Sequence, residues 1–222
     1  NGIKVLGTPL GRQEFVKAHA DERLGDEKRF LDRVRGVRDL QCAWLLLTYC
    51  AVPRANHFLR VLPPGEVLDY AQRHDDAVWQ CFCQLLGAGR LATDRLGRAV
   101  ATLPARLGGL GLRSAARTAP SAYWAAWVDA APVLASKAPR LSALLQQQAE
   151  LEVTPACLHA LQEAKRTLEA EGCANMPTWA EAVQGARAPY AEDPDAGEWK
   201  RGWQYHASSA REHHFSERVV LP

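Results

Sequence analysis

The stretch that decides the fold is Asp39–Val52, DLQCAWLLLTYCAV. Apolar residues occupy nearly every face of a helix drawn through it, and Asp39 is a credible N-cap. Pro53 follows directly and is expected to end the helix, because proline lacks a backbone N–H. A helix that is apolar all round is buried, so we expect residues 39–52 to form the central helix of the core.

The flanking sequence predicts further helices around this one. A short connection, 54–66, separates it from a helix over about 65–86, and another helix, over 13–37, precedes it and could split at Gly25-Asp26. Pro63-Pro64 can open the helix that starts near residue 65. Helical patterns also cover residues 118–130, 139–149, 155–171, 178–187 and 197–220.

Two segments depart from the helical pattern. Ile3–Leu6 is the one plausible strand, because turn-forming residues bound it on both sides. In LPARLGGLGLRSA, residues 103–115, Gly108, Gly109 and Gly111 predict a tight, specific turn, which we call the glycine corner. The predicted class is therefore mainly α, a multi-helix bundle with one short N-terminal β-strand or hairpin.

Charge and cysteine content narrow the function classes. The net charge of +2 is too small to indicate a nucleic-acid partner, but residues 81–120 hold six arginines and one acid, whereas 161–200 hold eight acids and four bases. This distribution fits either two solvated faces or a basic groove and an acidic lobe. No apolar run approaches the 18 or so residues of a membrane span, and the six cysteines fit reduced thiols. We expect an intracellular protein, in nucleus or cytoplasm, with no visible targeting signal.

Motif spacing predicts no catalytic or metal site. Cys81-x-Cys83 is too tightly spaced for a zinc pair, and His206 and His213 lie two helical turns apart. GGLGLRS lacks the lysine and the preceding strand of a phosphate loop. An enzyme site built from His57, His74 and nearby acids is a third hypothesis, weaker than the two binding roles given below.

Four stretches carry a family resemblance when they are taken together. They are IKVLGTPLG (3–11), LQCAWLLLTYCAVPRANHFLRVLPP (40–64), the A-x-x-HD of 71–75 and LPARLGGLGLRSAARTAPSAYWAAWVDA (103–130). In order and spacing they resemble the reverse transcriptases of non-LTR (LINE-type) retrotransposons, just C-terminal to the catalytic palm. The likeness covers about residues 2–130, with Val5 in place of the usual aromatic residue, and a looser likeness extends through 202–215.

This resemblance implies a domain plan. Residues 1–12 correspond to a palm and primer-grip strand, 13–135 to a thumb-like helical domain, and 136–222 to a helical extension that is first acidic and then basic and His-containing. In the family, palm aspartates hold two Mg²⁺ ions, and these aspartates are expected N-terminal to Asn1. We therefore expect that NGIKVLGTPLG begins inside a longer protein. We also expect no cofactor or catalytic residue on this chain, and no polymerase activity from it alone.

The remaining expectation is a binding role. Arginine beside exposed backbone amides suits phosphate oxygens, so an RNA or DNA duplex backbone is the candidate partner. The candidate binding residues are Lys4, Arg54, Arg60, Arg106, Arg113 and Arg117. The alternative is a retroelement-derived helical subunit that docks on other proteins in a larger assembly, with Trp79, Trp199 and Trp203 as interface anchors.

Overall fold

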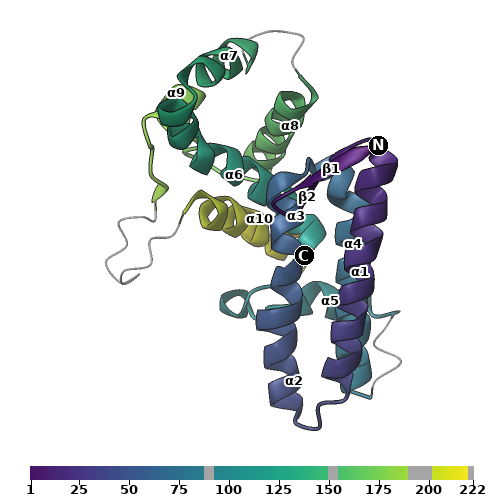
Figure 1. The fold of residues 1–222 in the computed structure, drawn as a ribbon. Coiled ribbons are helices and arrows are strands. Elements are labelled where there is room, and N and C mark those ends of the chain that lie inside the picture. The colour runs from purple at the N-terminus through teal and green to yellow at the C-terminus, as the bar shows by residue number, and fades with distance from the viewer. Residues whose placement is uncertain (88–92, 150–154, 190–201, 220–222) are drawn as a thin grey trace. The chain divides into compact units, whose positions relative to one another are not determined.

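The computed structural model describes residues 1–87, 93–149, 155–189 and 202–219 (Figure 1). The chain is mainly helical and begins with a two-stranded antiparallel hairpin, which confirms the predicted fold class. It divides into two compact units. The first unit contains Asn1–Leu62, Glu66–Ala119 and Phe215–Pro222, and the second contains Pro63–Gly65 and Pro120–His214. The domain ranges inferred from the family resemblance have other boundaries and stay a prediction.

The hairpin pairs strand β1, Gly2–Val5, with strand β2, Thr8–Gly11. Leu6, expected in the strand, instead forms the turn with Gly7, and both residues have positive φ, at 48° and 84°. A two-residue turn with both φ values positive matches the right-handed twist of the flanking strands. The Leu6 side chain at the tip is 94% exposed.

Helix α1, Gln13–Arg35, runs without a break through Gly25. Helix α2, Leu40–Leu46, begins at the expected cap, where the Asp39 carboxylate accepts a hydrogen bond from the Cys42 N–H at 2.7 Å. The Cys42 N–H lowers the pKa of Asp39, which is the sign expected of a carboxylate at a helix N-terminus.

The predicted stop at Pro53 is wrong. The chain continues from α2 into a π-helical segment, Leu47–Ala51, then a 3₁₀ turn, Val52–Ala55, and helix α3, Asn56–Val61. Pro53 lies in the first turn of the 3₁₀ segment, where no intrahelical partner is needed for the N–H that proline lacks. Every fourth residue of this path is buried: Ala43, Leu47, Ala51 and Ala55.

The first unit is completed by most of helix α4, Pro64–Leu85, by helix α5, Arg95–Ala101, and by a 3₁₀ turn, Ala105–Leu107. Helix α5 was not expected; Asp94 caps it by accepting a hydrogen bond from the Gly97 N–H at 2.9 Å. On α4, Leu68 is 43% exposed, whereas Tyr70 and Trp79 are buried. The core combines residues of α1, α2, the π-helical segment and α4, among them Leu31, Ala43, Leu47, Val78 and Trp79.

The second unit contains the greater part of helix α6, Ala115–Lys137, with α7, Pro139–Ala149, α8, Ala156–Ala170, α9, Trp179–Val183, and most of α10, Trp203–Val219. Its core is rich in aromatic residues, and Trp124 and Trp203 meet edge to face at 5.7 Å between ring centroids. Across the described helices, none combines the length and apolarity that a bilayer crossing requires.

Burial corrects the view of the tryptophans as interface anchors. Trp79 stacks on Phe82 in the core of the first unit, and Trp203 donates a hydrogen bond to the Ala186 carbonyl at 2.9 Å in the second. Both side chains are 5% exposed, so both stabilise the fold and neither presents a contact surface. Trp199 lies outside the described residues.

Candidate nucleic-acid interface

The glycine corner is a closed loop held by backbone hydrogen bonds. The Gly111 N–H donates to the Leu103 carbonyl at 2.8 Å, and the Leu112 N–H donates to the Ala101 carbonyl at 3.2 Å. Gly108 and Gly111 have φ values of +79° and +75°, in the left-handed region that favours glycine. The backbone between Arg106 and Arg113 is therefore fixed by its own geometry.

The corner is also anchored on the helix that follows Asp39. The Trp44 indole N–H donates to the Leu110 carbonyl at 3.1 Å. Gly111 packs on Thr48, where an added Cβ would lie 3.4 Å from the threonine methyl carbon. A side chain at position 111 would therefore be strained in its φ angle and close to a neighbour.

Asp75 joins the corner to α4. Its carboxylate accepts hydrogen bonds from the Ser114 hydroxyl at 2.6 Å and from the backbone N–H groups of Ala115 and Ala116 at 2.7 and 3.2 Å. These N–H groups open α6 and have no partner within the helix, so Asp75 caps it from a distant segment. The adjacent Asp76 pairs with Arg98 at 2.7 Å and is half exposed.

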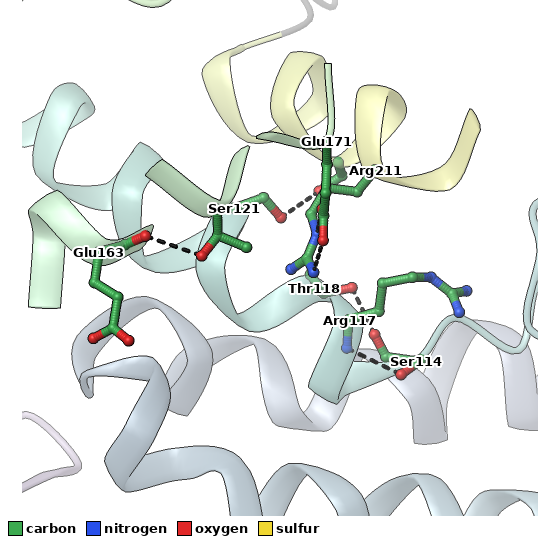
Figure 2. A network of polar contacts seen from close by, with 9 residues as sticks. Ser114, Arg117, Thr118, Ser121, Glu163, Glu171 and Arg211 are labelled. Atoms are coloured by element: carbon green, nitrogen blue, oxygen red, sulfur yellow. Dashed lines mark hydrogen bonds and ion pairs between the residues drawn. The ribbon is translucent and has the colours of Figure 1, made fainter. Parts of the chain in front are cut away.

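Ser114 extends this cap into the first turn of α6 (Figure 2). Its hydroxyl oxygen accepts a hydrogen bond from the Arg117 N–H at 3.1 Å, and its carbonyl accepts one from the Thr118 hydroxyl at 2.7 Å. The start of α6 is thus held by two side chains, Asp75 of α4 and Ser114 at the end of the corner.

His74, next to Asp75, is buried in a polar cluster with Glu27 and Tyr70. Its Nδ1 lies 2.8 Å from one Glu27 carboxylate oxygen, and the Tyr70 hydroxyl donates to the other at 2.6 Å. Glu27 and His74 are 3% and 2% exposed. Burial raises the pKa of Tyr70 well above its ordinary value, and the Glu27 charge raises it further.

The candidate arginines divide into those that build the fold and those that face solvent. Arg117 donates to the Thr102 carbonyl at 3.0 Å and lies over the Phe215 ring at 4.1 Å. Arg54 lies over the Phe30 ring at 5.1 Å. Arg106 and Arg113 are exposed, and Arg60 is half-buried on α3.

Lys4 does not lie at the glycine corner but at a polar cavity elsewhere in the first unit. It lines a cavity of about 270 Å³ between the hairpin, α1 and α3. Arg23, also in the lining, donates to the Arg54 carbonyl at 2.8 Å, so Lys4 and Arg54 are both near Arg23. The complete lining is Lys4, Leu6, Gly7, His19, Glu22, Arg23, Asp26 and His57.

The histidines named in the sequence have separate roles. His57 lies at the cavity, with Nε2 3.4 Å from the Thr8 hydroxyl, whereas His74 is enclosed with Glu27. In the second unit, His206 Nε2 lies 2.7 Å from the Ala174 carbonyl and His213 Nδ1 lies 2.9 Å from the Ser209 carbonyl. Within the described parts of the chain, no three His, Cys, Asp or Glu residues form a metal-binding group.

Figure 2 also shows the ion pair between Arg211 of α10 and Glu171, just after α8. The Arg211 Nη2 donates to one Glu171 oxygen at 2.8 Å while Nε contacts the other, a two-point contact that only a guanidinium makes. The two side chains are 12% and 22% exposed. This pair ties α10 to the end of α8 within the second unit, so Arg211 has a structural role.

Glu27, Arg23 and His19 were missed at the sequence level. All three belong to the polar residues of α1, which the helical pattern assigns to solvent. Their contacts outside α1 are with residues 31 to 47 positions away in sequence, or are made at the cavity beside the hairpin, so local periodicity carries no sign of them. The usable signal was His74 itself, a polar residue on the apolar stripe of α4 that requires a buried partner.

Replacing Asp75 with alanine should lower the free energy of unfolding by about 2–3 kcal/mol, because two helix N–H groups and a hydroxyl lose a charged acceptor. Asp76→Ala removes an equal charge from a half-exposed pair and should cost less than about 1 kcal/mol. Urea titrations followed by circular dichroism measure both. Equal losses in the two variants would contradict the capping role.

Tyr70→Phe should lower the stability by about 1–2 kcal/mol at neutral pH, since Glu27 loses a buried donor. Because the folded state raises the pKa of Tyr70, that stability is complete below the unfolded value of about 10 and declines as the pH rises above it. The gap between the wild-type protein and Tyr70→Phe should therefore narrow at alkaline pH. Tyr49→Phe, at a 71% exposed position, is the control and should show no gap. A Tyr70→Phe gap that stays constant with pH would contradict the coupling.

No protein-family model, curated protein or solved structure matches this chain. The resemblance of residues 2–130 to non-LTR reverse transcriptases therefore stays a prediction from the sequence.

Proposed function

We propose that this chain is a non-catalytic part of a reverse-transcriptase-like retroelement protein, in the thumb and connection region, and that it contacts the backbone of an RNA or DNA duplex. The resemblance of residues 2–130 supports the family part of the proposal. The observation that carries the duplex contact is the pair of exposed arginines, Arg106 and Arg113, on a loop whose backbone is held at several points. The proposal assigns the chain a place in the nucleus or cytoplasm and no chemical step.

Rigidity is what makes the two arginines useful as ligands. A phosphate contact made from a flexible loop must offset the entropy lost when the loop becomes ordered. Here the glycine turn, Trp44 and Asp75 already hold the loop. Binding then costs little beyond the two side chains themselves.

The local charge favours an anionic partner. Among the described arginines of 81–120, the side chains of Arg95, Arg106 and Arg113 are exposed to solvent. Arg98 pairs with Asp76, and Arg117 contacts Thr102. Asp94, the acid of this stretch, caps α5. Contacts of guanidinium groups to phosphate oxygens read no bases, so the binding should be independent of sequence and weaken as salt rises.

The double variant Arg106→Ala, Arg113→Ala should bind an RNA–DNA hybrid about five- to tenfold more weakly at low salt. It should also lower the slope of log affinity against log salt by about 2, because two phosphate contacts are lost. Fluorescence anisotropy with a labelled hybrid measures both quantities.

The matched control is Arg33→Ala, Arg38→Ala, which removes the same charge from exposed positions at and after the end of α1. Its salt slope should equal that of the wild-type protein. An identical loss in the two double variants would reduce the effect to net charge, and no binding by the wild-type protein at low salt would refute the proposal.

A second candidate function is docking on another protein. An apolar stripe favours it: Cys42, Leu45 and Tyr49 follow one another at helical spacing on α2 and the π segment, and all three are exposed, Tyr49 by 71%. Exposed apolar groups at such spacing suit a partner helix or groove.

Leu45→Ser with Tyr49→Ser should abolish any association that survives nuclease treatment and high salt, while duplex binding stays unchanged. Co-purification followed by light scattering tests this. A wild-type protein that is a monodisperse monomer under those conditions would contradict the docking function.

A further inference from the structure

We propose that the cavity between the hairpin, α1 and α3 binds a phosphate monoester, with Lys4 and Arg23 as permanent cations and His57 as a cation that protonation adds. Three separate elements bring these groups together: β1 supplies Lys4, α1 supplies Arg23 and α3 supplies His57. The site needs no duplex, so its failure would leave the proposed function untouched.

The two permanent cations differ in how they are held. Arg23 is fixed: its Nη2 donates to the Arg54 carbonyl, its Nε lies 3.7 Å from Glu27, and its guanidinium lies over the Phe58 ring at 5.1 Å. Lys4 is exposed, and among the described residues no group pairs with its ammonium. A fixed guanidinium beside a lysine without a partner is an arrangement that an anion completes.

His57 is positioned by the hairpin turn. Its Nε2 lies 3.4 Å from the Thr8 hydroxyl, and a Cβ added to Gly7 would lie 3.5 Å from the same nitrogen. The turn backbone at Gly7, with φ of +84°, therefore lies against the imidazole edge. A protonated His57 would present its Nε2–H where the Thr8 hydroxyl and a bound oxygen can both accept it.

Two carboxylates also line the cavity, and both already have partners. Glu22 lies 3.4 Å from His19 Nδ1, and Asp26 forms an ion pair with Arg29. Glu22 is 75% exposed and Asp26 is half exposed, so water screens both. The cationic and titratable groups that a ligand would meet in the cavity are Lys4, Arg23, His57 and His19, and Arg23 would contact it while keeping its own contacts to Glu27 and the Arg54 carbonyl.

The charges around His57 also favour a bound anion. Partial burial lowers the pKa of His57, and the positive charge of Arg23 lowers it further. A bound dianion would oppose the Arg23 charge and raise that pKa. By linkage, protonated His57 must then bind the dianion more tightly than neutral His57 does, by the same factor.

Size and pH dependence choose the monoester. At about 270 Å³ the cavity is smaller than most pockets for drug-sized ligands, which suits a single phosphate group. The exposed Leu6 at its rim offers an apolar contact to whatever carries that phosphate. A monoester is a dianion above about pH 6, whereas His57, whose pKa lies below the ordinary histidine value, is protonated only on the acid side of about 6.5, so affinity should pass through a maximum near pH 6.

The experiment is an NMR titration of the histidine ring protons between about pH 5 and 8, in inorganic phosphate and in chloride of equal ionic strength. His57→Gln identifies the His57 signal by its loss. Phosphate should raise the pKa of His57 by about one unit, which equals about tenfold tighter binding to the protonated form. Lys4→Ala should weaken phosphate binding about three- to fivefold, and the matched control Lys17→Ala, on the exposed side of α1, should not change it.

The remaining comparison separates the two sources of phosphate. A dinucleotide with a 5′-phosphate should shift the His57 signal as inorganic phosphate does, and the same dinucleotide without it should not. An equal response to both would assign the cavity to backbone diesters and overturn the monoester assignment. A His57 pKa that is the same in phosphate and in chloride, or an affinity unchanged by Lys4→Ala, would overturn the site.

Discussion

The first unit depends on two consecutive side chains in the middle of α4. His74 contacts Glu27 of α1, and Asp75 contacts the N–H groups that open α6. Neighbouring residues on a helix point about 100° apart, so one turn of α4 reaches two different elements. In each contact a carboxylate accepts hydrogen bonds from groups that would otherwise lack a partner. Removing either carboxylate therefore leaves polar groups unpaired.

This arrangement explains why the glycine corner has a defined shape although it is a loop. At one end of the corner, backbone N–H groups donate hydrogen bonds to the carbonyls of Ala101 and Leu103. At the other end, the Ser114 hydroxyl and the Ala115 N–H donate to the Asp75 carboxylate. Between these ends the Trp44 indole holds the Leu110 carbonyl. The elements on either side of the corner therefore fix the backbone that carries the two exposed arginines. Loops held on a stable scaffold in this way are where binding residues concentrate.

The sequence predicted the helices well where a local pattern determines them. Asp39 and the proline and glycine signals place most helix ends within a few residues, and the histidine on the α4 stripe required a buried partner. The capping role of Asp75 was not predicted, because nothing local indicates a helix N-terminus 40 positions away. Glu27 and the cavity were missed for the same reason, and Pro53 misled because a 3₁₀ turn accommodates it.

The π-helical segment Leu47–Ala51 limits how the length of this chain can vary. Residues four apart drift by about 40° per step around an α-helix, yet Ala43, Leu47, Ala51 and Ala55 all stay buried across it. The wider turn absorbs one extra residue. A chain one residue shorter there would close an ordinary α-turn and rotate Phe58 and Leu59 by about 100° relative to α2. A one-residue deletion here would therefore turn core residues away from the core, whereas substitutions that keep the apolar face leave the path of the chain unchanged.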